Sequence, residues 1–179
     1  GWEEYLQRHL RYGGKVIGIC GGYQMLGETL LDPHGLESHE KNSQSNGFGF
    51  IPMNTVLEKD KQLKQRQGSL LLANFQAQLT GYEIHCGVSR FNTDVKALAQ
   101  LENGQQEGFI SPDNAIIGTY LHGIFDHPQA LAALLDWAGA KDITHFDYNA
   151  LRENEINRLA DSVEQQIKID ELIQQCQND

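Results

Sequence analysis

A short apolar run that ends in a cysteine and two glycines constrains this chain more than any other feature of its sequence. Residues 16–19 are Val, Ile, Gly and Ile, an uncharged run typical of buried strands in parallel sheets. Cys20 and a pair of glycines follow directly, and residues 23–26 favour a helix. A reactive residue on a sharp strand-to-helix turn needs small neighbours, because the turn cannot close around bulky ones. The pattern therefore predicts a nucleophile elbow with Cys20 between a strand and a helix.

The predicted position of Cys20 favours chemistry at its sulfur atom. The amino end of a helix carries unpaired N–H groups and a partial positive charge, and both stabilise a thiolate. The N–H of Gly21 would point toward an oxyanion formed on a substrate that Cys20 attacks. A free cysteine is more commonly a small buried residue. Here the flanking Gly18 and Gly22 favour the nucleophile instead.

The composition excludes several classes of function. The chain has 179 residues, 40% of them hydrophobic, and no apolar run approaches the length of a membrane span. Its net charge of −10, with few and scattered basic residues, argues against a nucleic-acid partner. The first residues lack the basic region and apolar core of a signal peptide. The three cysteines have no metal-binding spacing, so we expect no metal, and their odd number favours a reduced, cytoplasmic setting.

Helix and strand patterns together predict a mixed α/β fold. Residues 2–12, 128–138 and 147–176 have helical spacing, and we expect the first of these helices to pack on a sheet. Between residues 69 and 120, short alternating runs separated by Gly, Asn and Asp predict hairpins with antiparallel pairing. The charged stretch at 59–67 is typical of an exposed connection. We therefore expect one domain, with helices flanking a sheet that is parallel at the elbow and antiparallel later.

A second reactive side chain follows another predicted strand. The apolar run at residues 115–120 leads to His122 and then to Gly123, which leaves room for a substrate. Histidine exchanges protons near neutral pH and is a common general base. His122 lies 102 positions after Cys20, but the strand ends of one sheet can converge in space. His122 is therefore our candidate base, against the alternative of a core histidine bonded to a carbonyl.

Three blocks of the sequence resemble the class I glutamine amidotransferases. Residues 18–27 (GICGGYQMLG) are similar to the nucleophile motif of this superfamily. Residues 81–87 (GYEIHCG) and 118–125 (GTYLHGIF) are similar to two blocks of its cobalamin-biosynthesis branch, and all three occur in the family's order. The resemblance implies a flavodoxin-like fold in which the cysteine attacks the carboxamide of glutamine and the histidine is the base. It also implies that Gln24 contacts the glutamine substrate or the oxyanion region.

The sequence departs from the family's pattern at the third catalytic position. Triad amidotransferases usually have a Glu two residues after the histidine, and here that position is Ile124. Related cobalamin amidotransferases also lack this Glu. Either the Cys–His pair suffices or another acid orients the histidine, with Glu83 the first candidate and Asp126 a weaker one. Since alternate residues of a strand share a face, we predict that Glu83 and His85 line the pocket or its edge toward another domain.

The resemblance also implies a longer enzyme. Family members carry a strand and a Pro-Gly-rich turn before the elbow, and that turn donates a second oxyanion N–H. No such turn precedes Cys20 here, so we expect the chain to lack its first strand–helix unit. We expect it to follow a synthetase domain that binds ATP and Mg²⁺ and uses ammonia to convert adenosylcobyrinic acid a,c-diamide to adenosylcobyric acid. No cofactor is expected in the chain itself. With half of its oxyanion hole absent, the chain alone should hydrolyse glutamine on the order of 10²-fold or more slowly than the intact enzyme.

Three alternatives stay open at this point. One is another amidotransferase of the same branch, such as one that forms cobyrinic acid a,c-diamide or one that amidates peptidoglycan precursors. Another is a cysteine hydrolase of the α/β type without ammonia transfer, which an assay with ester substrates would distinguish. The third is a non-catalytic docking domain, against which the intact pair of Cys20 and His122 argues.

Overall fold

The computed structural model describes residues 1–72, 75–140, 148–167 and 173. The chain divides into two compact units, residues 1–142 and residues 143–179. The first unit contains the helices α1 (Trp2–Arg11), α2 (Gly21–Leu26) and α3 (Pro128–Trp137). Its strands are β1 (Val16–Ile19), β2 (Thr29–Asp32), β3 (Ser43–Asn46), β4 (Met53–Leu72), β5 (Phe75–Phe91), β6 (Ala99–Leu101), β7 (Gln106–Glu107), β8 (Phe109–Ile110), β9 (Ile116–Thr119) and β10 (Leu121–His122).

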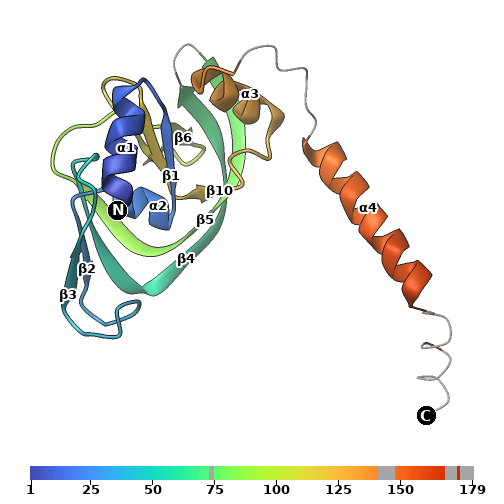
Figure 1. Ribbon diagram of the computed structural model, residues 1–179, viewed down its shortest axis with the longest axis horizontal. Coiled ribbons are helices and arrows are strands. Elements are labelled where there is room, and N and C mark those ends of the chain that lie inside the picture. Colours follow the sequence, from blue (N-terminus) through green and yellow to red (C-terminus); the bar gives the residue numbers. More distant parts are fainter. Residues whose placement is uncertain (73–74, 141–147, 168–172, 174–179) are drawn as a thin grey trace. The chain divides into compact units, whose positions relative to one another are not determined.

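The strands of the first unit form two sheets (Figure 1). The smaller sheet has the order β1-β9-β8, with β1 and β9 parallel and β8 antiparallel to β9. The larger has the order β10-β5-β4-β2-β3, in which only the β2–β4 pair of this path is parallel, and β6 and β7 extend it from β4. The predicted combination of parallel pairing at the elbow and antiparallel pairing later in the chain is confirmed. It is divided between two sheets rather than contained in one.

The longest feature is an antiparallel ribbon of β4 and β5, which Figure 1 shows as a strongly curved pair. Because residues 59–67 lie inside β4, their prediction as a connection is wrong. Residues 62–67 pair with 80–85 of β5 through the backbone, while most side chains of the stretch are exposed. Backbone pairing does not require an apolar face, so a strand that is polar on both faces lacks the alternation by which strands are predicted.

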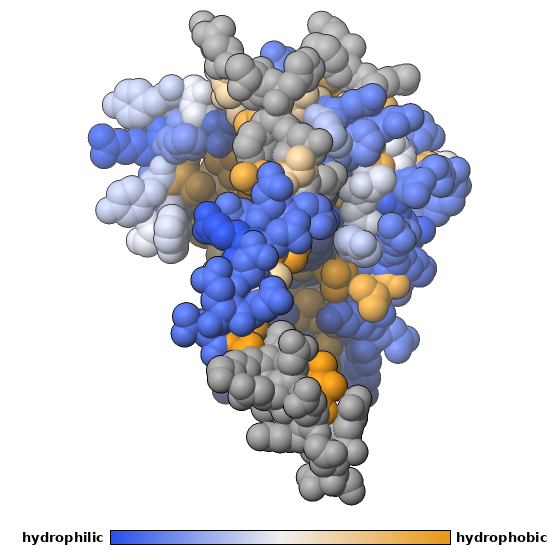
Figure 2. Space-filling model, turned by 90° about the vertical axis from the view of Figure 1, so that its right-hand side faces the viewer, coloured by the Kyte–Doolittle hydropathy of each residue, from blue (hydrophilic) through white to orange (hydrophobic). Residues whose placement is uncertain are grey.

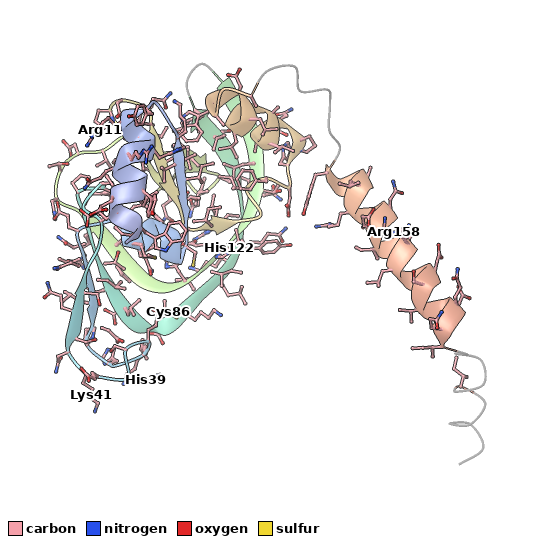
Figure 3. The ribbon with its side chains drawn as sticks, in the orientation of Figure 1. Arg11, His39, Lys41, Cys86, His122 and Arg158 are labelled. Atoms are coloured by element: carbon pink, nitrogen blue, oxygen red, sulfur yellow. The ribbon has the colours of Figure 1, made fainter. Side chains whose placement is uncertain are left out.

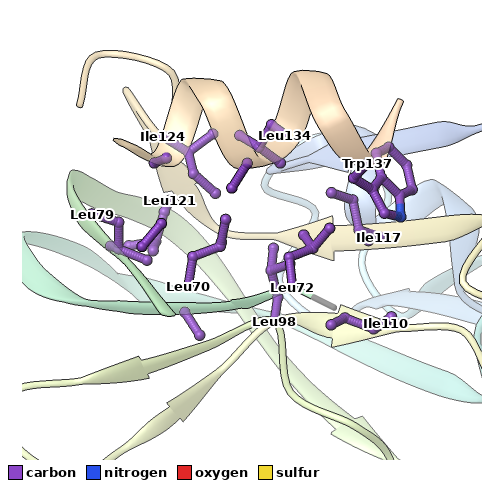
Figure 4. Packing of buried hydrophobic residues seen from close by; sticks show 14 of the residues in the cluster. Leu70, Leu72, Leu79, Leu98, Ile110, Ile117, Leu121, Ile124, Leu134 and Trp137 are labelled. Carbon is purple, nitrogen blue, oxygen red and sulfur yellow. The ribbon is translucent and has the colours of Figure 1, made fainter. Parts of the chain in front are cut away.

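A hydrophobic cluster joins α3 to strands of both sheets (Figure 4). Leu70 and Leu72 come from β4, Ile117 from β9, and Leu134 and Trp137 from α3, and each is at most 6% exposed. Burying one such aliphatic side chain contributes about 1.5–3 kcal/mol to the stability of the fold. The cluster therefore holds β9 firmly between the larger sheet and α3.

Two glycines allow the elbow helix α2 to pack on the smaller sheet. Gly18 on β1 and Gly118 on β9 are direct partners in the ladder. A Cβ atom on Gly118 would lie 2.1 Å from the ring of Tyr23, and one on Gly18 would lie 2.6 Å from a methyl carbon of Leu26. Both of these α2 side chains are buried. Larger residues at either position would lift α2, and with it the turn at Cys20, off the sheet.

The helix α1 differs from its prediction. None of its residues is buried, and Trp2 and Tyr5 are 76% and 70% exposed. Leu10 is partly buried and packs against a second hydrophobic cluster that includes Tyr23 and Ile116. The first helix therefore contacts the core at Leu10, near its carboxyl end, and leaves its aromatic side chains at the surface.

The second unit contains the helix α4 (Tyr148–Gln166), within the range predicted for the final helix. Asp147, residues 168–172 and residues 174–176 lie outside the described part of the chain. The apolar side chains of this helix are at the surface, since Leu151, Ile156 and Leu159 are 42%, 51% and 66% exposed. The expectation that the whole chain is a single domain stays a prediction.

The face of the molecule in Figure 2 is mostly hydrophilic, with hydrophobic residues in separate small patches. Charged residues make up 21% of the chain, close to the average of about 25% for globular domains. In the part of the chain that the structure describes, no helix is long and apolar enough to cross a membrane.

Candidate active site

Cys20 directly follows β1 and has a strained backbone conformation. Its φ and ψ are 52° and −113°, a region that residues with a side chain rarely adopt and that costs on the order of 1–3 kcal/mol. Its N–H donates to the carbonyl of Thr119 on β9 at 2.9 Å, and α2 begins at the next residue. The sharp strand-to-helix turn that the sequence predicts is therefore present.

The thiol of Cys20 lies against β5, with open space on the side of α2. Its Sγ donates to the carbonyl oxygen of Ile84 at 3.4 Å. Among the described residues, no atom lies within 4 Å of where a Cβ would stand on Gly21 or Gly22. The first turn of a helix has N–H groups without intrahelical partners. A substrate above Gly21 could therefore receive hydrogen bonds from this turn.

His122 lies on β10, in the larger sheet. It pairs with Tyr82 of β5, and Figure 3 shows it beside this curved ribbon. A Cβ on Gly81 would be only 2.7 Å from the backbone oxygen of His122, so β10 approaches β5 closely because position 81 is glycine. The Nε2 atom of His122 is buried, and the described residues offer it no hydrogen-bond partner. An unpaired buried nitrogen is uncommon, and a functional role is one reason for it.

Both candidate catalytic residues bind to the strand β5. Cys20 contacts it at Ile84 and His122 pairs with it at Tyr82, two positions away and about 7 Å along the strand. The strands that precede both residues are parallel neighbours whose carboxyl ends are in register. The fold therefore brings Cys20 and His122 to the same end of the smaller sheet.

Glu83 and His85 bind each other next to this position. One oxygen of Glu83 accepts hydrogen bonds from Nε and Nη2 of Arg66, both at 2.7 Å, and the other lies 2.9 Å from Nε2 of His85. Burial acts to raise the pKa of Glu83, but the bonds from His85 and Arg66 outweigh it and hold that pKa below its usual range. Both oxygens of Glu83 have partners, which favours a role in the wall of the site over direct orientation of His122.

Gln24 belongs to a buried polar cluster under the elbow. Its amide donates to the hydroxyl of Tyr120 at 3.3 Å, and that hydroxyl also lies 2.5 Å from Oγ of Ser89. The ring of Tyr120 stacks on His85, with ring centroids 3.9 Å apart. Burial raises the pKa of Tyr120, so its hydroxyl stays protonated at neutral pH. Gln24 thus links the elbow helix to the wall formed by His85, and its predicted contact with substrate stays a prediction.

The position of the usual third catalytic residue is part of the core. Ile124 is 1% exposed and belongs to the hydrophobic cluster under α3. A carboxylate there would be buried among apolar side chains at a large cost. The carboxylate of Asp126, the weaker candidate, lies near Gly123, where a Cβ would stand 3.0 Å from one of its oxygens.

A buried carboxylate that the sequence analysis did not single out lies at the end of β9. Glu107 on β7 accepts hydrogen bonds from the N–H of Tyr120 at 2.7 Å and from the hydroxyl of Thr119 at 2.8 Å. Burial raises its pKa to about 7. Its one signal in the sequence is an acidic residue among the short alternating runs between residues 69 and 120 that predict strands. That pattern does not distinguish a buried acid from an exposed one.

The chain has two cysteines besides Cys20. Cys86 is a free, half-buried cysteine near the bend of the β4–β5 ribbon, away from His122 (Figure 3). Cys176 lies outside the described residues. Within the described ranges, no group of three or more His, Cys, Asp or Glu side chains is arranged to hold a metal ion. The absence of a metal stays a prediction.

Residues 1–130 match the CobB/CobQ-like glutamine amidotransferase domain. The chain belongs to this family. It is also 64% identical, over 186 aligned positions, to a cobyric acid synthase of Marinomonas sp. (strain MWYL1). That match covers 99% of this chain but 37% of the relative, so this amidotransferase domain spans well under half of the relative's length.

One solved structure supports the fold. A crystal structure of a glutamine amidotransferase superposes with a TM-score of 0.51 at 16% identity, over 76% of this chain and 68% of that one. A glutamine amidotransferase from Thermotoga maritima gives a TM-score of 0.42 at 14% identity, over 93% and 62% of the two chains. The first likeness supports the predicted mixed α/β fold of the class I amidotransferases.

Proposed function

We propose that this chain is the glutaminase part of a cobyric acid synthase, with Cys20 as nucleophile and His122 as base. The observation that carries the proposal is the geometry around β5. Cys20 stands on a strained elbow with its sulfur at Ile84, and an unpaired nitrogen of His122 lies on the strand paired two positions away. Membership of the amidotransferase family and the 64% identity to a cobyric acid synthase support the choice of glutamine as substrate.

The reaction needs a nucleophile, a base that later acts as an acid, and an oxyanion donor. His122 takes the thiol proton, which ends the hydrogen bond from Sγ to Ile84, and the sulfur attacks the carboxamide carbon of glutamine. The N–H of Gly21 faces the oxyanion. His122 then gives its proton to the leaving nitrogen, the C–N bond breaks, and ammonia departs from a thioester. Water, deprotonated by His122, attacks the thioester, and glutamate leaves as the proton returns to Cys20.

No carboxylate acts from position 124 in this scheme, because Ile124 is part of the core. We assign Glu83 and His85 to the wall of the glutamine pocket, where Arg66 fixes the charge of Glu83. Gln24 holds the same wall through Tyr120 and lies in the first turn behind Gly21, next to the oxyanion region.

The ammonia is used, in this proposal, by a synthetase domain of the same polypeptide. The greater length and the name of the relative support this part. ATP and Mg²⁺ belong to that domain, which amidates adenosylcobyrinic acid a,c-diamide to adenosylcobyric acid. The chain described here supplies ammonia without a cofactor of its own, in the cytoplasm.

Replacing the nucleophile in the intact polypeptide tests the proposal. Cys20→Ser should lower glutamine-dependent amidation and glutamine hydrolysis by about 10⁴-fold or more, while amidation with added ammonia survives. Cys86→Ser is the matched control and should leave both activities unchanged. Loss of the ammonia-dependent reaction as well would contradict this division of labour. Comparable hydrolysis of simple esters by the wild-type chain would instead favour a cysteine hydrolase.

A further inference from the structure

The backbone changes from one sheet to the other just before His122. The strand β9 ends at Thr119 in the smaller sheet, and β10 begins at Leu121 in the larger. A chain that leaves one ladder for another needs other partners for the N–H groups at the change, since buried backbone donors are almost always paired. Glu107 supplies them. One of its oxygens accepts from the N–H of Tyr120 and the other from the hydroxyl of Thr119, which itself accepts from the N–H of Leu121 at 3.0 Å.

The environment of Glu107 sets it apart from an ordinary surface acid. It is 7% exposed, and the described residues form no ion pair with it. Burying a carboxylate without a counter-charge is costly. The bonds from Tyr120 and Thr119 act against that cost, but burial outweighs them and the pKa is about 7. The burial of this carboxyl group, at the point where the chain changes sheets, therefore lowers the stability of the fold.

Glu107 binds the backbone next to both candidate catalytic residues. Thr119 accepts the N–H of Cys20 through its carbonyl and binds Glu107 through its hydroxyl. On the other side, β10 is a strand of two residues that pairs with β5 only at Leu121 and His122. So short a strand has little pairing of its own to fix where it lies, and the anchor before it decides its position.

We propose that Glu107 is a positioning residue for glutamine hydrolysis, which fixes His122 relative to Cys20 by binding the backbone where the chain changes sheets. This inference rests on the proposed function. Glu107 acts through Thr119 and Tyr120 rather than by contact with the substrate. The length of its side chain is decisive, because both oxygens must reach their partners at once.

Two variants of the intact polypeptide test the role, since they separate length from charge. Glu107→Asp keeps the charge but is one methylene shorter, so it should lower kcat for glutamine hydrolysis by about 10²-fold, the usual cost of a small misplacement. Glu107→Gln keeps the length and should stay within about tenfold of the wild-type kcat. In both variants we expect KM to be unchanged and ammonia-dependent amidation to survive. Glu102→Asp, at an exposed site, is the control.

The outcomes distinguish this inference from the proposed function. A wild-type kcat in Glu107→Asp, equal losses in both variants, or a change confined to KM would overturn the positioning role, while an inactive Cys20→Ser protein would leave the proposed function in place. Full glutamine-dependent activity in Cys20→Ser would overturn both. Should Glu107→Asp fail to fold, Glu107→Ala compared with Glu107→Gln gives the same decision, with the large loss expected in the alanine variant.

Discussion

The two candidate catalytic residues are held in place by different means. The position of Cys20 depends on consecutive residues, since β1, the strained turn and α2 all lie within residues 16–26. The position of His122 depends on parts that are far apart in the sequence. These are the strand β5 with Gly81 and the carboxyl group of Glu107. The nucleophile is thus a local feature and the base a tertiary one, so distant substitutions should affect the base more than the nucleophile.

The largest effect that sharpens this contrast should come from removing the base. His122→Ala should lower glutamine hydrolysis by about 10³-fold or more, because in the proposed reaction its imidazole takes the thiol proton and returns it to the leaving group. Steady-state kinetics with glutamine and with ammonia would measure it. The exposed His34 provides the control, and His34→Ala should have wild-type kinetics. Activity within tenfold of wild type in His122→Ala would show that His122 is not the base.

A smaller effect is expected from a change in the contact between the elbow helix α2 and β9. Gly118→Ala would place a methyl group 2.1 Å from the ring of Tyr23, and that ring is itself buried, so it has little room to move. We expect the free energy of unfolding to fall by about 3 kcal/mol, measured by chemical denaturation. Gly22→Ala is the matched control, because the described atoms leave open space there and alanine suits a helix. Equal stabilities of the two variants would show that the elbow does not depend on close packing against β9.

The smallest effect concerns the charge of Glu107. Its pKa of about 7 in the folded protein exceeds the ordinary 4.5, so the native state binds the proton more tightly than the unfolded chain does. Its contribution to stability is therefore complete below about pH 4.5 and is lost as the pH rises through 7. Glu107→Gln lacks this loss, and its stability relative to wild type should improve by about 2 kcal/mol between pH 5 and pH 7. Parallel stability profiles of the two proteins would contradict this prediction.

Several features of the fold could be predicted because they depend on neighbouring residues. The helix α3 begins at Pro128 as expected, and the ring of His127 accepts a hydrogen bond from the N–H of Gln129 at its start. The stretch at 59–67 could not be predicted as a strand, since its pairing with β5 is made by backbone atoms that every sequence shares. For α1, helical spacing was sufficient to predict the helix but not how much of it would be buried.

The sequence alone determined the strand, the turn at Cys20 and the helix of the elbow, because steric limits on a tight turn act between adjacent residues. It also determined the family, through three short blocks in the right order. Only the tertiary structure decided that His122 enters a second sheet, that Ile124 faces the core, and that Glu107 binds the backbone at Tyr120, where the chain changes sheets. The physical reason is that these relations arise from burial and from pairing between strands distant in the chain, and neither is visible in the residues that take part.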